Sequence, residues 1–187
     1  MRVLGVVLAA GSGTRMGAPK ATLEIGGERL LDRAVVALRN GGCDDVAAVV
    51  PVGVTAPPGV VTVENPDAAS GMRSSLVAAL TVAPGYDALA VTLVDTPGVG
   101  PTAVAAAVGA WRSAPGRVVV AAYGGRRGHP TVMAVQRWTV AVDLAGPDEG
   151  ARAYLQAHAA DVVEVAVDGD PTDLDTPADL ARWLEGR

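Results

Sequence analysis

Short apolar runs alternate with helix-like segments along most of this 187-residue chain, and this alternation limits the folds open to it. Runs of about four to eight residues rich in Val, Ala and Leu are typical of buried strands, and the segments between them place apolar residues at helical spacing. Strands joined through helices pair in parallel and are covered on both faces. The pattern therefore predicts an α/β domain with a mostly parallel central sheet in three layers.

The predicted elements follow from these runs. The strands are expected at residues 2–9, 46–50, 60–63, 88–94, 118–122, 131–135 and 162–167. The helices are expected at residues 28–39, 101–111 and 136–144, in segments that end near residues 80 and 160, and in a last segment that ends at residue 184. Residues 123–130 are predicted to be a loop. A chain of this length fits one domain, so we expect residues 1–187 to form a single unit.

Composition and charge exclude several classes of function. The formal net charge of −5 argues against nucleic acid as a partner, because phosphate backbones are bound by broad clusters of Lys and Arg. The single cysteine, Cys43, excludes an intramolecular disulfide and fits a reducing compartment. The apolar run at residues 2–9 is too short to span a membrane. We therefore expect a cytoplasmic protein that binds neither nucleic acid nor membranes.

The first predicted strand leads into a glycine-rich stretch, LAAGSGTRMGAPK at residues 8–20. Its three glycines allow sharp turns and bring backbone N–H groups close to a ligand. Arg15 and Lys20 add positive charge, and Lys20 is the only lysine in the sequence. The stretch is predicted to bind phosphate.

Two common phosphate-binding loops do not fit this stretch. A dinucleotide fingerprint needs the spacing G-x-G-x-x-G and an acidic residue at the end of the next strand, and both are missing. A Walker loop needs Ser or Thr after its lysine, whereas Lys20 is followed by alanine. The loop is therefore of a third type.

Further blocks follow the loop in a fixed order: SGMRSS at 70–75, LVDTP at 93–97, GHP at 128–130, GPDEGAR at 146–152 and DLDTP at 173–177. Together with the loop, these blocks resemble the nucleotidyltransferases of molybdopterin-cofactor biosynthesis, and they are most similar to the molybdenum cofactor cytidylyltransferase type. The resemblance implies a Rossmann-like nucleotidyltransferase fold. It also implies Mg²⁺-dependent transfer of CMP from CTP to a phosphorylated acceptor, a molybdopterin-type cofactor, with release of pyrophosphate.

Such a transfer brings anions together, so cations and N–H groups must hold the phosphates. Arg15 and Lys20 are the candidate catalytic cations. The loop and a polar segment that opens a helix supply the candidate nucleotide-binding residues: Leu8, Ala9, Ala10, Gly11, Ser12, Gly13, Asn65, Ser70, Gly71 and Ser74. For the polar segment, capping of the helix is the alternative explanation.

Asp95 is the candidate Mg²⁺ ligand, because it follows an apolar run at the carboxyl end of a strand, where ligands bind in open α/β sheets. A simple turn before Pro97 is the alternative. Asp173 and Asp175 are two residues apart and point to the same side if their segment is extended, so either could complete the site. His129 and Arg152 are the candidate acceptor-binding residues, and for His129 a role in shaping the turn before Pro130 is the alternative.

Several alternatives stay open at this point. Within the superfamily, the reaction could be guanylyl transfer to molybdopterin or phospholactate, or cytidylyl transfer to methylerythritol phosphate. Alanine at position 10 favours CTP by resemblance, because guanylyl-transferring relatives tend to have glycine there. An NAD(P)-dependent reductase and a non-catalytic nucleotide sensor are the alternatives from other classes.

Overall fold

The computed structural model describes residues 1–11, 13 and 16–185 of the chain. Within these residues, seven strands form one sheet in the order β5-β4-β1-β6-β8-β7-β9. Their bounds are β1 (Val3–Leu8), β4 (Asp45–Val50), β5 (Val61–Glu64), β6 (Ala88–Leu93), β7 (Val118–Tyr123), β8 (Arg126–Ala134) and β9 (Val162–Val167). Strand β8 runs antiparallel to both of its neighbours, and the remaining pairs are parallel. The predicted mostly parallel α/β sheet is confirmed.

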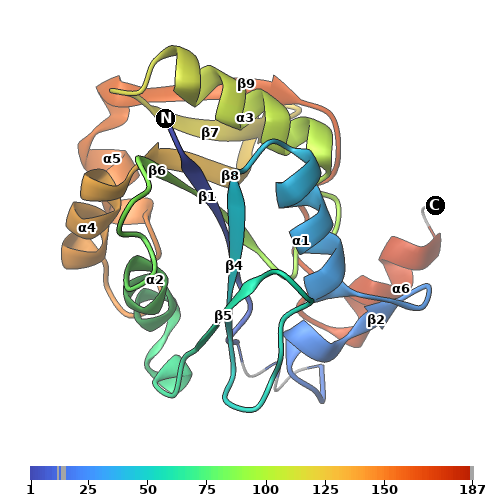
Figure 1. Cartoon of the computed structure of the whole chain (residues 1–187). Helices are drawn as coiled ribbons and strands as arrows, with labels where there is room; N and C mark the ends of the chain where they lie inside the picture. The colour runs from blue at the N-terminus through green and yellow to red at the C-terminus, as the bar shows by residue number, and fades with distance from the viewer. Residues whose placement is uncertain (12, 14–15, 186–187) are drawn as a thin grey trace.

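Helices cover both faces of the sheet (Figure 1). One face carries α1 (Leu30–Asn40) and α3 (Pro101–Ser113), and the other carries α2 (Met72–Leu80), α4 (Val135–Leu144) and α5 (Arg152–Ala157). The last helix, α6 (Pro177–Glu185), follows β9. Each helix of the described residues is too short or too polar to cross a bilayer.

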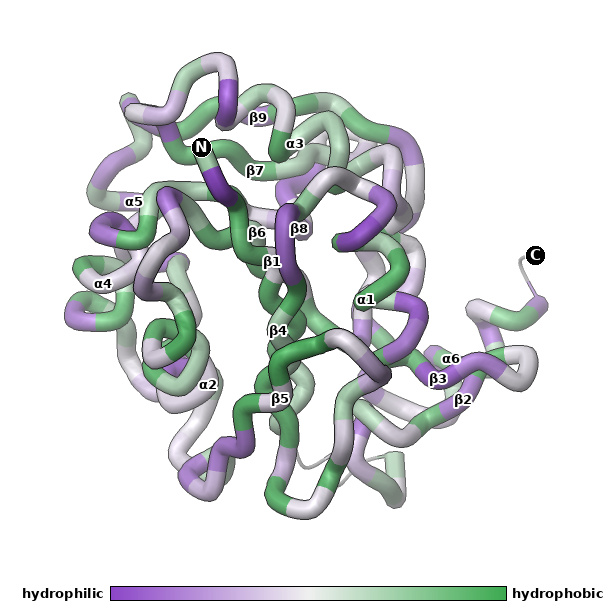
Figure 2. Tube along the Cα trace, viewed as in Figure 1, coloured by the Kyte–Doolittle hydropathy of each residue, from purple (hydrophilic) through white to green (hydrophobic). Residues whose placement is uncertain are grey.

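Strand β1 shows why the sheet is buried on both sides. Val3 and Val7 pack into the core beneath α1 and α3, whereas Leu4 and Val6 pack into the core beneath α2 and α4. A strand with two apolar faces needs a continuous apolar run, as the sequence has here. Figure 2 shows the same pattern, with hydrophobic central strands and more hydrophilic helices and loops outside them.

Two predictions about local structure are wrong. Residues 126–130 were expected in a loop but belong to β8, because Gly124 and Gly125 adopt positive φ angles of 55° and 81° and close a two-residue hairpin from β7. A second short hairpin pairs β2 (Glu24–Ile25) with β3 (Glu28–Arg29), and β3 occupies the first two residues of the predicted first helix. These hairpins went unrecognised because their strands are polar or very short.

The topology brings the carboxyl ends of β1 and β6 together. The two strands are parallel neighbours, with Leu8 opposite Leu93 at their last paired position. The glycine-rich loop leaves β1 at this edge, and Asp95 follows β6 at the same edge. The predicted phosphate-binding loop and the predicted metal ligand therefore lie next to each other.

Candidate functional site

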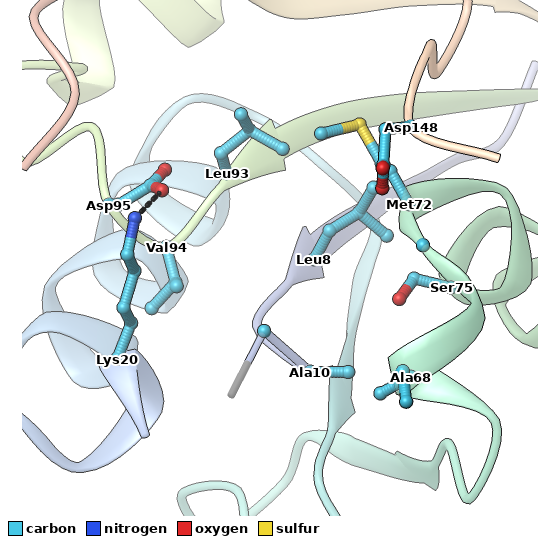
Figure 3. Close-up of a pocket in the computed structure, with 13 residues that line it drawn as sticks. Leu8, Ala10, Lys20, Ala68, Met72, Ser75, Leu93, Val94, Asp95 and Asp148 are labelled. Carbon is cyan, nitrogen blue, oxygen red and sulfur yellow. Dashed lines mark hydrogen bonds and ion pairs between the residues drawn. The ribbon is translucent and has the colours of Figure 1, made fainter. Parts of the chain in front are cut away.

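Lys20 and two carboxylates meet at this edge of the sheet. The Nζ atom of Lys20 lies 2.6 Å from Asp95 Oδ2 and 2.5 Å from Asp175 Oδ1. Lys20 begins the 3-10 helix η1 (Lys20–Thr22), and Figure 3 shows its side chain reaching across to Asp95. The side chains of Lys20 and Asp95 are only 13% and 17% exposed, whereas that of Asp175 is 52% exposed. Three segments far apart in the sequence thus build one charged cluster.

The contacts within this cluster change the pKa values of its members. Desolvation lowers the pKa of Lys20, but the hydrogen bonds to Asp175 and Asp95 outweigh it and leave that pKa above its ordinary value. Asp173 lies near the same carboxylates: desolvation, followed by the charges of Asp95 and Asp175, raises its pKa. Lys20 is therefore a firmly charged ammonium beside a group of aspartates.

The residues present fit a hard divalent cation. Asp95 Oδ1 is buried and has no hydrogen-bond partner in the described part of the chain, so one carboxylate oxygen at the cluster is left for another ligand. No group of three or more His, Cys, Asp or Glu side chains in the described residues forms a complete protein cage for a metal. Mg²⁺ is commonly bound in this way, through one or two carboxylates with substrate phosphates and water completing the shell.

A cavity of about 320 Å³ opens beside the cluster. Its walls come from β1, β6, α2 and the loop before α5, as Figure 3 shows. The lining residues are Leu8, Ala10, Gly11, Lys20, Ala68, Ala69, Gly71, Met72, Ser75, Leu93, Val94, Asp95 and Asp148. Five residues from the sequence-based site therefore line this cavity together with Asp95. We name it the first cavity.

Other predicted nucleotide-binding residues lie outside its lining. Ala9 is buried, and its N–H group donates to Val49 in β4. Gly13 has φ 59°, and an added Cβ atom would lie 2.0 Å from the carbonyl oxygen of Ala18, so the turn requires glycine. Ser70 donates its hydroxyl to the carbonyl of Asp67. Ser12 and Arg15 lie outside the described residues.

Asn65 organises the hydroxyl groups at the start of α2. Its Oδ1 accepts the N–H of Asp67, which orients the amide so that Nδ2 donates to Ser74 Oγ at 2.9 Å and to Ser75 Oγ at 3.1 Å. The Ser74 hydroxyl donates to the Gly71 carbonyl. Ser75 lines the first cavity and its hydroxyl donates to no acceptor among the described residues. Ser75 therefore leaves an O–H donor at the cavity wall, whereas the hydroxyl of the predicted Ser74 is already bound to Gly71.

The loop before α5 is fastened onto the start of α2. Gly71 has φ 104°, and a Cβ atom there would lie 2.4 Å from the Pro147 carbonyl oxygen and 2.5 Å from Asp148 Oδ1. The N–H of Arg73 donates to the same Pro147 carbonyl. Gly71 thus allows close contact between two segments, and Asp148 reaches the cavity wall as a consequence.

A second cavity of about 580 Å³ adjoins the first and shares four wall residues with it: Leu8, Met72, Leu93 and Asp148. Its lining is mixed, and the apolar residues Val91 and Trp138 are nearly buried behind it. The polar residues that line it, besides Asp148, are Arg127, His129, Thr131, Glu149, Arg152, Gln156 and Asp173. The structure therefore brings the two predicted acceptor residues, His129 and Arg152, to one cavity.

These two residues differ in charge. Desolvation lowers the pKa of His129, and its Nδ1 lies 3.3 Å from the Val91 carbonyl oxygen, so the ring is neutral and Nδ1 carries the proton. The side chain of Arg152 makes no hydrogen bond or ion pair within the described structure, and it is exposed. Arg152 supplies a free positive charge at the rim, and His129 supplies a neutral polar surface.

Comparison with known proteins agrees with this geometry. The MobA-like NTP transferase domain family matches residues 5–162. Nicotine blue oxidoreductase from Paenarthrobacter nicotinovorans is 35% identical, over 97% of this chain and 96% of the relative. A homologue of Rv0371c from Mycobacterium sp. strain JC1 is 30% identical with a TM-score of 0.83, over 100% of this chain and 98% of that one. Rv0371c from Mycobacterium tuberculosis in complex with manganese is 26% identical with a TM-score of 0.82, and both chains are covered completely.

The family match extends from β1 to the start of β9 and includes both cavities' main walls, the glycine-rich loop and Asp95. The sequence therefore identified the family correctly from its ordered blocks. The chain belongs to the MobA-like NTP transferase domain family and is a nucleotidyltransferase.

Proposed function

We propose that this enzyme transfers CMP from CTP to a phosphorylated, molybdopterin-type acceptor with Mg²⁺ and releases pyrophosphate. The observation that carries the proposal is the Lys20 ammonium held between Asp95 and Asp175 beside two adjoining cavities. One cavity would take the nucleotide and the other the acceptor.

In the reaction, an oxygen of the acceptor phosphate attacks the α-phosphorus of CTP. A P–O bond forms there, the bond from that phosphorus to the oxygen bridging to the β-phosphate breaks, and pyrophosphate leaves with the electron pair. The acceptor phosphate is ionised at neutral pH, so the attack needs no general base. The neutral His129 accordingly needs no catalytic role.

Lys20 would place its charge on the α-phosphate or the leaving phosphates as negative charge develops there. A divalent cation held by Asp95 with Asp173 or Asp175 would neutralise phosphate charge and orient the triphosphate. Arg15, in the same loop, is the proposed second cation. A unit charge pair at about 4 Å contributes roughly 4 kcal/mol at an effective dielectric of about 20. A few such contacts are enough to offset the repulsion between two phosphate groups.

One feature supports CTP as the donor. Ala10 lines the first cavity, and relatives that transfer guanylyl groups tend to have glycine at this position, so the resemblance favours CTP. Ser75 offers an O–H donor in the same cavity, which suits the carbonyl and ring-nitrogen acceptors of cytosine and guanine alike.

The second cavity supports an anionic acceptor. Its volume of about 580 Å³ and its mixed apolar and polar lining suit a molecule that carries both a ring system and polar groups, and the exposed Arg152 offers charge for a phosphate. The choice between a molybdopterin-type acceptor and methylerythritol phosphate is made by the control acceptors of the test.

The test is release of pyrophosphate by the purified chain with Mg²⁺, CTP or GTP, and the cofactor as acceptor. We expect release with CTP that exceeds release with GTP and that disappears in Asp95→Asn. Methylerythritol phosphate and phospholactate are the control acceptors. Absence of release with every triphosphate and acceptor would overturn the proposal.

The relative from Paenarthrobacter nicotinovorans bears the name of an oxidoreductase, so a reductase is the second candidate. The structure offers a poor dinucleotide site, because β1 leads through the glycine-rich loop to the three-residue helix η1, and β4 ends at Val50 before Pro51 without an acidic residue. Titration with NADH and NADPH decides between the two functions: saturable binding with turnover of a dye substrate would favour the reductase.

A further inference from the structure

The segment that leads from β9 into α6 is anchored at two points on either side of Asp175. On one side, Leu174 is 1% exposed and its N–H group donates to the Asp95 carbonyl oxygen at 2.9 Å. On the other side, the carboxylate of Asp179 in the first turn of α6 holds the backbone. Asp175 thus lies between a buried apolar anchor and a helix cap.

Asp179 makes an unusually complete cap. Its Oδ2 atom accepts the N–H groups of Thr176 at 2.8 Å and Asp175 at 3.2 Å, and it also accepts the Thr176 hydroxyl at 2.8 Å. The Thr176 Oγ1 atom accepts the N–H of Asp179 in return. These bonds, led by the Thr176 hydroxyl, lower the pKa of Asp179 to about 2, so the carboxylate is ionised under working conditions. This reciprocal pattern is a capping box, which fixes how the chain enters a helix.

Asp175 needs such a constraint. Its side chain is 52% exposed, and its carboxylate makes its ion pair with Lys20 alone among the described residues. An ion pair with an exposed partner contributes little when that side chain is free to move, because ordering it offsets the attraction. A backbone already fixed at Asp175 removes much of that cost, so the cap decides how firmly Asp175 holds Lys20.

We propose that Asp179 is a positioning residue of the active site: its cap on α6 holds Asp175 against Lys20 and so sets the geometry of the Lys20, Asp95 and Asp175 cluster. Asp179 itself touches neither Lys20 nor Asp95. The consequence for metal and triphosphate binding rests on the proposed function, whereas the consequence for Lys20 does not.

The sole lysine makes the first test specific. In protein labelled with [¹⁵N]lysine, one side-chain Nζ resonance reports on Lys20, and its slow proton exchange reports on the two carboxylate bonds. We expect Asp179→Ala to shift this resonance toward its position in Asp175→Asn and to speed proton exchange. Asp179→Glu, which restores an ionised carboxylate at the position that a capping box favours, is expected to return the resonance toward the native one.

The second test measures the apparent dissociation constant of Mn²⁺ by calorimetry, with and without CTP. Loss of a residue that orients a metal-binding carboxylate weakens metal binding by about 10-fold or more, and we expect that change in Asp179→Ala. Arg182→Ala is the matched control, since it removes the other partner of Asp179 and leaves the cap in place. Should Asp179→Ala not fold, Thr176→Val weakens the same cap from its other end.

A variant that loosens α6 through helix propensity alone, Ala181→Gly at an exposed position, separates positioning from general stability. If Ala181→Gly shifts the Lys20 resonance as much as Asp179→Ala at a comparable loss of melting temperature, the proposal is wrong. It is also wrong if Asp179→Ala leaves the resonance and its exchange rate unchanged. If the Lys20 resonance responds to Asp179→Ala as expected but the native protein transfers no nucleotide, the positioning role of Asp179 stands and only the proposed function is overturned.

Discussion

Replacement of Lys20 by methionine tests the centre of the site. Methionine keeps much of the side-chain volume and removes the charge, so Asp95 and Asp175 lose the ammonium that lies 2.6 Å and 2.5 Å from their oxygens. Removing one partner of a fully buried ion pair costs about 3–5 kcal/mol. Because Asp175 is half exposed and partly solvated, a loss of about 2–3 kcal/mol is expected here.

This loss has a measurable size. In a domain of this length, 1 kcal/mol corresponds to roughly 2–4 °C of melting temperature, so Lys20→Met is expected to melt about 4–12 °C lower. Removal of one positioned donor from a transition state costs about 10²–10³-fold in turnover, which pyrophosphate release would show. Calorimetry of unfolding and the turnover assay therefore test two separate consequences of one substitution.

A divalent cation provides the third readout. With Lys20 gone, the uncompensated carboxylates are free to bind a cation, so Mn²⁺ is expected to raise the melting temperature of Lys20→Met more than that of the native chain. The matched control is Arg112→Met, which breaks the ion pair of 2.8 Å between Arg112 and Asp44. That pair is more than a third exposed, so its loss costs at most about 1 kcal/mol and no response to Mn²⁺ is expected.

The refuting result is clear. If Lys20→Met has the melting temperature and the turnover of the native chain and responds to Mn²⁺ no more than Arg112→Met does, the ion-pair cluster is not the site of catalysis. A loss of stability without any loss of turnover would make Lys20 a structural residue and would also sink the proposed role.

Three further predictions concern other parts of the molecule. Ser75→Ala is expected to raise the KM for CTP about 5–10-fold in steady-state kinetics, because one hydrogen bond of about 1 kcal/mol to the ligand is lost, and an unchanged KM would rule Ser75 out as a base contact. Cys43 is buried, and desolvation raises its pKa to about 12, so a thiol reagent at pH 8 is expected to modify it only after denaturation, and rapid labelling of the folded chain would contradict this. The hydrogen bond from the Val3 N–H, assisted by the charge of Arg112, lowers the pKa of Asp44. The ionised carboxylate of Asp44 therefore contributes to the free energy of unfolding above the ordinary pKa, and this contribution is lost as the pH falls through the lowered pKa. Denaturant titrations should therefore show Asp44→Asn about 1 kcal/mol less stable than the native chain at pH 7, with the difference shrinking as the pH falls below the ordinary pKa of an aspartate.

The meeting of the loop and Asp95 was predictable from sequence, because it follows from a topological rule. Parallel strands end at the same edge of a sheet, and ligands bind outside those ends. Once the runs at β1 and β6 were recognised as buried strands, Lys20 and Asp95 had to lie at one edge. Their actual contact depends on the turn at Gly13, which no rule of periodicity describes.

The finer assignments depend on details that the sequence does not display. Ser74 and Ser75 are adjacent in the chain, but successive residues of a helix point about 100° apart, so only the observed start of α2 at Met72 decides which hydroxyl faces the cavity. The polar strand at Arg126 was missed for a related reason, because hairpin pairing with β7 outweighs its weak apolar pattern.

Asp173 and Asp175 flank a buried residue but differ in environment. Leu174 between them is 1% exposed. Asp175 holds Lys20, whereas Asp173 lines the second cavity. Sequence spacing predicted that both aspartates are near the site, but the different packing around each carboxylate is visible only in the structure.

The chain has fourteen arginines and a single lysine, Lys20. The geometry also explains why this position has the lysine. Two carboxylate oxygens approach a single nitrogen atom at 2.6 Å and 2.5 Å, which suits a compact ammonium with three donors. A guanidinium would form a planar, two-pronged contact with one carboxylate and fit poorly between two. Under the proposed function, an ammonium on a flexible stem would also be free to turn from these oxygens to phosphates once a divalent cation is bound by Asp95. The preference for lysine follows from the contact with two carboxylates, which a fixed guanidinium fork would oppose.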